Sequence, residues 1–237
     1  MIKIYGKNCV YAAIMANSDI SVVYLSEDVV KSDKNILDIL KKRVYKKVII
    51  PKKKLDIEFP YQNQGYGAHR ENYMILDESY LDNLPKERGR VLILDGIQDP
   101  HNFGAILRSV DAFGYDLVIL PKNRSVSVNE TVAHVSTGAI EYTKIMYVNS
   151  LNNIVEKLKK QGYWICGTDA KGTVLSKDID KSLNLAVIIG SEGFGMSKTL
   201  VNASDFLIKI PMKGHVNSLN ASVSSGIVLH DLMANDN

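Results

Sequence analysis

The stretch IKIPMKGHVNSLNASVSSGIVLHDL, residues 208–232, decides how the rest of the chain is interpreted. Its apolar start is typical of a buried strand, and Pro211 ends that strand before a polar loop. The loop leads into a segment with helical spacing, where Ser218 or Asn220 is suited to cap the first free N–H groups. The helix opens with small residues that let a backbone or a ligand come close: Ala221, Ser222, Ser224, Ser225 and Gly226. Close packing and ligand binding both explain them at this point.

Continuous apolar runs recur through the chain from residue 90 onward. They read VLILDG (91–96), DLVILP (116–121), YWICGT (163–168), LAVIIG (185–190) and FLIKIP (206–211), and each precedes a loop and a helical pattern. Fully apolar strands separated by helices predict a parallel sheet that is covered on both faces. Because ligands bind beyond the carboxyl ends of such strands, three loops are informative: DGIQDPHNFG, GSEGFG and PMKGHVNSLN.

The first part of the chain has shorter elements and predicts a separate small α/β domain. Helical spacing covers residues 10–15 and 36–44, and strand patterns cover 21–25, 48–50 and 73–76. Residues 77–88 have the composition of a linker. We therefore expect one domain at 1–76 and a second domain at 89–237.

Basic residues are concentrated in one part of this first domain. The whole chain has 29 lysines and arginines against 26 acidic residues. No acidic residue interrupts the stretch that contains Lys41, Lys42, Arg43, Lys46, Lys47, Lys52, Lys53 and Lys54. Such a run fits a surface that binds phosphates, and it also fits an ordinary solvated helix end and loop.

The sequence argues against several classes of protein. No apolar run approaches the roughly 18 residues of a membrane-spanning helix, and the N-terminus lacks the apolar core of a signal peptide. We therefore expect a cytoplasmic protein without a membrane partner. Cys9 and Cys166 are too isolated to form a disulfide framework or a zinc site, so we expect no metal.

The loop after residues 91–96 carries two polar residues with a distinctive spacing, Asn102 and Arg108. At 100° per residue they lie about 240° apart around a helix, so they share a site only if Asn102 stands at the mouth of the helix. A plainer interpretation makes Asn102 a helix-start signal and pairs Arg108 with Asp111 on the surface.

The glycine-rich loop after residues 185–190 differs from the common nucleotide-binding motifs. Glu192 occupies the place of the middle glycine in the dinucleotide fingerprint, and no phosphate-loop lysine follows. A carboxylate at this position would repel a pyrophosphate. Glu192 suits a neutral or cationic ligand, or hydrogen bonds to neighbouring loops, and the loop also fits an ordinary glycine-rich turn.

Taken together, the three loops resemble the SpoU (TrmH) family of RNA ribose 2′-O-methyltransferases. The resemblance rests on DPHNFGAILR (99–108), IIGSEGFGMS (188–197) and IPMKGHVNSLNASVSSG (210–226), in family order. Two N-terminal stretches, IYGKNCVYAA (4–13) and NQGYGA (63–68), also resemble the RlmB-like branch, whose members methylate a guanosine ribose in 23S rRNA. One departure is His215-Val216-Asn217 before Ser218, where small residues are more usual.

This resemblance implies a SPOUT-type, trefoil-knotted α/β catalytic domain with a parallel sheet, preceded by a small α/β RNA-binding domain. It implies S-adenosylmethionine as methyl donor, held mainly by backbone groups at Gly190, Ile210 and Leu219. It also implies a homodimer in which both protomers form each site. The expected partner is 23S rRNA or a ribosome-assembly particle, and the basic residues between 41 and 54 become candidate RNA ligands.

The motif positions assign catalytic roles to Asn102, Arg108, Glu192, Ser218 and Asn220. Since a guanidinium stays protonated, we expect Arg108 to hold an RNA phosphate and stabilise alkoxide charge. Asn102 would hold the loop junction and Glu192 would fix loop geometry, while Ser218 and Asn220 would orient Arg108 or cap the last helix. Three alternatives stay open: a tRNA ribose methyltransferase, an rRNA methyltransferase for antibiotic resistance, and a ribosome-assembly factor without catalysis.

Overall fold

The computed structural model describes residues 1–216 and 218–234. Asn217 of the loop quoted above lies outside the described residues, as do residues 235–237. The chain forms two compact units, one of Met1–Tyr73 with Val128–Tyr142 and one of Met74–Ser127 with Thr143–Asn237. The unit that contains residue 1 is called the N-terminal unit below, and the other, which holds the three loops that resemble the methyltransferase family, is called the catalytic unit after the role which that resemblance implies.

The N-terminal unit is built on a four-stranded sheet with the order β1-β4-β2-β3. Its strands are β1 (Ile2–Tyr5), β2 (Ile20–Ser26), β3 (Lys46–Ile50) and β4 (Tyr66–Arg70). Its helices are α1 (Lys7–Met15), α2 (Glu27–Ser32), α3 (Lys34–Lys41), α4 (Lys52–Glu58) and α6 (Glu130–Val135), with short 3₁₀ turns η1 (Tyr61–Asn63) and η3 (Ala139–Glu141). β4 pairs antiparallel with β1 and β2, whereas β2 and β3 are parallel. The α/β character expected for this part of the chain is confirmed.

The segment Val128–Tyr142 belongs to the N-terminal unit although it follows β7 in sequence. The side chain of Glu141 is only 2% exposed and forms an ion pair with Arg70, with 3.0 Å between Nε and Oε2. The hydroxyls of Ser18 and Tyr73 donate to the same carboxylate at 2.6 and 2.9 Å. We predicted that residues 128–142 belong to the second domain, because the composition of residues 89–237 marks no internal boundary.

The catalytic unit has an eight-stranded sheet with the order β10-β12-β9-β11-β6-β7-β8-β5. Every neighbouring pair is parallel, which confirms the predicted parallel sheet. The strands are β5 (Ile75–Leu76), β6 (Arg90–Asp95), β7 (Leu117–Pro121), β8 (Ile145–Val148), β9 (Tyr163–Thr168), β10 (Val174–Leu175), β11 (Asn184–Gly190) and β12 (Phe206–Lys209).

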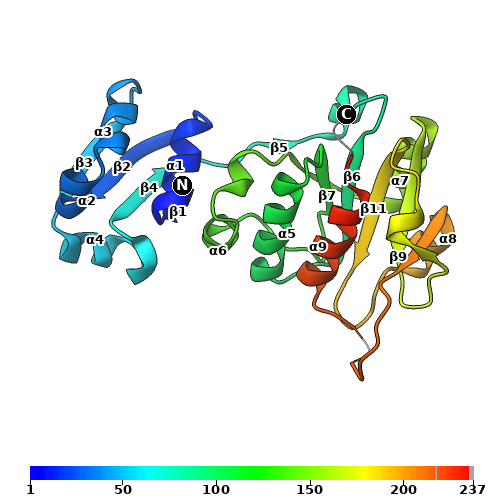
Figure 1. The fold of residues 1–237 in the computed structure, drawn as a ribbon. Coiled ribbons are helices and arrows are strands. Elements are labelled where there is room, and N and C mark those ends of the chain that lie inside the picture. Colours follow the sequence, from blue (N-terminus) through cyan, green and yellow to red (C-terminus); the bar gives the residue numbers. More distant parts are fainter. Residues whose placement is uncertain (217, 235–237) are drawn as a thin grey trace. The chain divides into compact units, whose positions relative to one another are not determined.

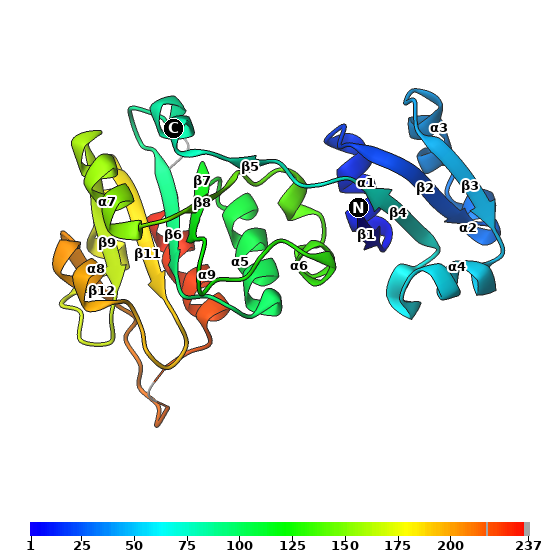
Figure 2. The ribbon, with the colours of Figure 1, turned by 180° about the vertical axis from the view of Figure 1, so that it is seen from behind.

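Helices cover both faces of this sheet (Figures 1 and 2). α5 (Pro100–Ala112) and α9 (Ala221–Leu232) pack together on one face, and α7 (Leu151–Lys160) and α8 (Lys198–Ala203) pack on the opposite face. Two 3₁₀ helices, η2 (Glu78–Asn83) and η4 (Ser176–Asp178), complete the unit. Alternate strand residues such as Val91 and Ile93 join the apolar cluster of α7 and α8, and Leu92 is equally buried.

Several predicted element boundaries differ from the structure. The strand expected at 73–76 is β5, which pairs with β8 in the sheet of the catalytic unit. The presumed linker contains η2, whose Leu81 is buried in the apolar cluster of that unit. The helix expected at 36–44 ends at Lys41. Strands β1, β4, β8 and β10 had no counterpart in the prediction.

Chain order reverses at the centre of the catalytic sheet. From β6 the chain proceeds outward to β7 and β8, and then crosses back to β9 and β11 on the other side. β6 and β11 therefore lie side by side, with Asp95 opposite Gly190. Ligands bind at such switch points in open parallel sheets. The knotted threading of the C-terminal segment stays a prediction.

The described helices include none that is both long and apolar enough to cross a membrane. Among the same described residues, no group of three or more His, Cys, Asp or Glu side chains is arranged to hold a metal ion.

Candidate active site

Three polar side chains converge beyond the carboxyl ends of β6 and β11. Asn102 lies in the first turn of α5, Glu192 lies in the loop after β11, and Asn220 immediately precedes α9. The amide of Asn102 donates to Glu192 Oε1 at 3.0 Å, and the amide of Asn220 donates to the same oxygen at 2.8 Å. Asn220 Nδ2 also lies 2.9 Å from Asn102 Oδ1. We call these three residues the amide–carboxylate cluster.

Glu192 is the centre of this cluster. Its Oε1 accepts a third hydrogen bond from the backbone N–H of Ala221 at 3.1 Å. One carboxylate oxygen thus joins the loop after β11 to the starts of α5 and α9. Hydrogen bonds to an ionised acceptor are stronger than neutral ones, so this oxygen is an effective anchor between loops.

Asn220 serves two functions at once. Its Oδ1 accepts from the backbone N–H groups of Ser222 and Val223 at 2.9 and 3.3 Å, so it caps α9. Its Nδ2 faces the cluster. Of the two cap candidates, Asn220 is therefore the cap, and exposed Ser218 makes no hydrogen bond with a described residue.

Asn102 is not the cap of α5. That cap is Asp99, whose Oδ1 accepts from the backbone N–H of His101 at 3.0 Å, and Pro100 is the first helical residue. Asn102 is only 8% exposed, and both of its side-chain contacts are to the cluster. The alternative in which Asn102 is merely a helix-start signal is wrong.

Arg108 lies apart from the cluster within this chain. It is six residues beyond Asn102 on α5, or about 9 Å along the helix axis. Its side chain is exposed and makes no ion pair with Asp111 or any other described residue. The structure brings together Asn102, Glu192 and Asn220, and it leaves Arg108 and Ser218 free to meet another molecule.

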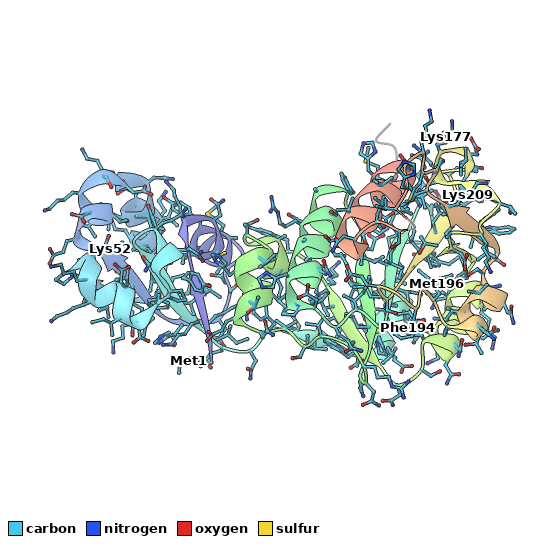
Figure 3. All side chains as sticks on the ribbon, turned by 90° about the horizontal axis from the view of Figure 1, so that it is seen from below. Met1, Lys52, Lys177, Phe194, Met196 and Lys209 are labelled. Carbon is cyan, nitrogen blue, oxygen red and sulfur yellow. The ribbon has the colours of Figure 1, made fainter. Side chains whose placement is uncertain are left out.

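Gly190 stands where the loop after β11 turns back on itself. Ser191 and Gly195 form a two-residue bridge, with backbone hydrogen bonds of 3.1 and 3.0 Å. A Cβ on Gly190 would lie 2.2 Å from the carbonyl carbon of Gly195, so no other residue fits without moving the loop. Phe194 and Met196, labelled in Figure 3, differ sharply, since Met196 is buried and Phe194 is 94% exposed.

The backbone of the loop before α9 is outside the regular secondary structure. No backbone–backbone hydrogen bond joins a described residue between 210 and 219 to another described residue. Ile210 and Leu219, at its two ends, are half-buried. Unpaired backbone N–H and C=O groups beside half-buried apolar side chains suit a ligand with a purine ring and a polar tail, so this loop fits S-adenosylmethionine.

A cavity of about 1000 Å³ opens beside the cluster. Asn102 and Glu192 line it, while the predicted cofactor residues Gly190, Ile210 and Leu219 do not. Its other walls come from the loops after β6, β7 and β8, with polar residues that the sequence analysis missed: Asn123, Arg124, Asn149 and Asn152. The polar runs KNRS and NSLNN after residues 117–121 and 145–148 were the available signal.

The basic stretch of the N-terminal unit surrounds its edge strand β3. Lys41, Lys42, Lys46, Lys47, Lys53 and Lys54 are exposed. Arg43 and Lys52 are half-buried, and Lys52 donates to Asn63 Oδ1 at 2.7 Å and pairs with Asp56. Lys41 pairs with Asp38 at 2.8 Å. Most of the predicted RNA-binding side chains are therefore accessible, and Lys52 also has a structural role.

Comparisons with known proteins place the chain in a family. Residues 89–230 match the model of the SpoU rRNA Methylase family. A Staphylococcus aureus relative, named for the TrmH family of tRNA/rRNA methyltransferases, is 41% identical over 235 residues, which cover 97% of this chain and 94% of the relative.

Two solved structures differ in how much of the chain they match. The rRNA methyltransferase from Sinorhizobium meliloti, solved with bound AdoMet, has a TM-score of 0.78 at 21% identity and covers 98% of this chain and 86% of its own. The A. aeolicus TrmH/SpoU tRNA modifying enzyme has a TM-score of 0.56 at 27% identity and covers 66% of this chain and 82% of its own.

Proposed function

Because the chain belongs to the SpoU (TrmH) family of RNA methyltransferases, we propose that it methylates a ribose 2′-hydroxyl, most specifically that of a guanosine in 23S rRNA. The observation that carries this proposal is the cluster of Asn102, Glu192 and Asn220 at the switch point of the sheet. It brings the three family loops together at one edge.

S-adenosylmethionine is the cofactor of this reaction and supplies an electrophilic methyl group on a sulfonium. The residues that would hold it are Gly190, Ile210 and Leu219. The backbone groups at the described residues 210–216, 218 and 219 would supply its hydrogen bonds, and the cluster fixes the far end of that loop through Asn220.

The hydroxyl is a weak nucleophile and must be positioned and relieved of its proton. The N–H groups of the cluster are already paired with Glu192 Oε1, which makes Glu192 a positioning group rather than the base. Arg108 is exposed and permanently charged, so it stabilises developing alkoxide charge and holds a neighbouring phosphate. The proton passes to that phosphate or to water.

The separation between Arg108 and the cluster supports a homodimer. Within one chain the two lie about 9 Å apart along α5. Val223 and Ile227 on α9 are 51% and 38% exposed, so α9 presents an exposed apolar surface that begins one turn beyond Asn220. A second copy seated on this surface brings its Arg108 to the cluster, and each site then draws on both chains.

The share of this chain that each of the two solved structures matches favours rRNA over tRNA as the substrate. The Sinorhizobium rRNA enzyme matches both units, whereas the A. aeolicus tRNA enzyme matches about two thirds of the chain. The exposed lysines around β3 give the N-terminal unit a surface for RNA phosphates. We extend the proposal to a role in rRNA processing in the cytoplasm, with 23S rRNA or an assembly particle as the substrate.

The test is methylation of ribosomal RNA from cells that lack the protein, followed by mapping of 2′-O-methyl groups. Arg108→Ala should lower the single-turnover rate by about 10²–10³-fold, the usual effect of removing a charge-stabilising donor. Lys160→Ala, at an exposed cation on α7, which packs on the face of the sheet opposite to α5, is the control and should be near wild type. A tRNA signal, or a wild-type rate for Arg108→Ala, would contradict the proposal.

Mixing two inactive variants tests the shared site. Arg108→Ala and Glu192→Ala should each be nearly inactive alone, but a mixed dimer keeps one site with both groups intact. After subunit exchange at equal amounts, about a quarter of the wild-type activity should return. No recovery, with exchange verified, would place Arg108 and the cluster in the same chain.

A further inference from the structure

The large cavity beside the cluster has no assigned ligand. The ends of β6, β7, β8 and β11 all contribute to it, and its volume of about 1000 Å³ is ample for a nucleoside. Asn102 and Glu192 belong both to the cavity wall and to the cluster. A group bound in the cavity therefore lies next to the loops where the reaction takes place.

The loops that form the cavity are fixed to one another. The backbone N–H of Val126 donates to Ile97 O at 2.9 Å and joins the loops after β6 and β7. The hydroxyl of Tyr147 on β8 donates to Val126 O at 2.8 Å. The N–H of Ser197 donates to Asp95 Oδ2 at 2.8 Å and attaches the loop after β11. The cavity is a preformed feature of the catalytic unit.

The charges of the lining disfavour a free phosphate. Asp95, Asp99 and Glu192 supply three carboxylates, whereas Arg124 and Lys198 supply two cations. The interior thus repels an anion, although the two cations can meet a phosphate at the rim. Arg124 has a left-handed φ of 59°, which is unfavourable for a non-glycine residue and marks this loop as constrained.

The remaining lining is suited to the edge and face of a nucleobase. Gln98, Asn123, Asn149 and Asn152 offer amides, each with donors and an acceptor. Amides and carboxylates read base edges, and an exposed aromatic ring such as Phe194 stacks on a base. A guanine edge presents N1–H and N2–H₂ donors together, which a carboxylate accepts.

We propose that this cavity binds the base of the nucleotide whose ribose is methylated, and that Asp99 makes it prefer guanine. This inference rests on the proposed function and names where its substrate is held. Asp99 is exposed and uses Oδ1 to cap α5, which leaves Oδ2 for a ligand. The amide–carboxylate cluster, whose Asn102 and Glu192 line the cavity, then connects the bound base to the loop before α9 through Asn220.

The first test compares two neighbouring asparagines on α7. Asn152 lines the cavity, whereas Asn153 does not, and both are exposed. In filter binding of ribosomal RNA with saturating S-adenosylmethionine, Asn152→Ala should raise the Kd for RNA about fivefold or more, as for loss of a base contact. Asn153→Ala should match wild type, and calorimetry should show the same Kd for S-adenosylmethionine in both variants.

Two results would overturn the proposal. Equal RNA affinity for Asn152→Ala and Asn153→Ala would show that the cavity does not contact RNA. A weakened Kd for S-adenosylmethionine in Asn152→Ala would assign the cavity to the cofactor. If wild-type protein binds RNA but transfers no methyl group, the proposed function fails, while the comparison of the two variants still decides the question of the cavity.

The preference for guanine is tested with Asp99→Asn. Asparagine keeps the cap of α5 but replaces one acceptor by a donor. Two synthetic fragments that differ only by guanosine or adenosine at the mapped position should bind wild type with Kd values about tenfold apart, and Asp99→Asn should reduce that ratio. An unchanged ratio would refute the role of Asp99.

Discussion

Asn220 offers a way to measure what holds the reaction site together, because one side chain both caps α9 and joins the cluster. Asn220→Ala removes the cap, which is worth about 1 kcal/mol. It also removes the donors to Asn102 and Glu192, together worth about another 1 kcal/mol after allowance for their partial exposure. The expected loss is about 2 kcal/mol, which lowers the Tm of a unit of this size by roughly 4–8 °C.

The serine variant separates the two contributions. Asn220→Ser keeps a cap oxygen but has no amide to reach Glu192, so it should recover about 1 kcal/mol of the loss. The assay is thermal unfolding followed by tryptophan fluorescence. The single tryptophan, Trp164, lies on β9, so its signal reports on the catalytic unit.

A double-mutant cycle with Asn102 completes the test. If the two asparagines act through the shared carboxylate of Glu192, the combined loss should differ from the sum by about 1 kcal/mol. Strict additivity, or a loss below about 0.5 kcal/mol for Asn220→Ala, would refute the view that the cluster stabilises the junction. Equal stability of the alanine and serine variants would show that the cap contributes nothing.

Two further predictions concern stability. Arg90 is 1% exposed and its guanidinium donates to four backbone carbonyls, including Leu232 O at 2.6 Å. Arg90→Met should leave these acceptors unpaired and lower the free energy of unfolding, measured with denaturant, by about 3 kcal/mol. A decrease below about 1 kcal/mol would contradict this. Burial acts to raise the pKa of Asp33, but hydrogen bonds that include those from Tyr66 and Tyr11 outweigh it and hold the pKa well below its usual value. The folded state then binds fewer protons than the unfolded state, so this stabilisation is present above about pH 4 and is lost on acidification. Asp33→Asn should therefore be less stable at pH 7 and lose less stability between pH 5 and pH 3 in calorimetry, and parallel acid curves would contradict the assignment.

The sheet of the catalytic unit could be predicted because its central strands are buried on both faces. Strands such as β6 and β11 read as unbroken apolar runs, which few other structures produce. The N-terminal unit gave a weaker signal. β4 reads YGAHR, and its Gly67 is required because a Cβ would lie 2.5 Å from the ring of Phe59. A central strand that makes room for an aromatic ring does not show the usual alternation.

The contacts of the site could be anticipated only in part. The family resemblance brought Asn102, Glu192 and Asn220 together as a set, but their shared oxygen depends on β6 and β11 being neighbours. Strand order cannot be derived from periodicity. The same limit applies to residues 128–142, whose place in the N-terminal unit depends on contacts distant in sequence: Ala133 lies in its apolar cluster, His134 stacks on Tyr5, and Glu141 pairs with Arg70.

The structure also changes the explanation for the small residues at the start of α9. Only Ala221 and Ser225 are buried, whereas a Cβ on Gly226 would meet Ser109 Oγ at an ordinary 3.6 Å. Close packing is therefore needed on one face of the helix, and the remaining small residues, Ser222, Ser224 and Gly226, are half-buried. What distinguishes α9 is that polar groups hold both of its ends, Asn220 to the cluster and the carbonyl of Leu232 to Arg90. Since Arg90 begins β6 and Asn102 follows it on α5, the same β6–α5 segment holds α9 at both ends.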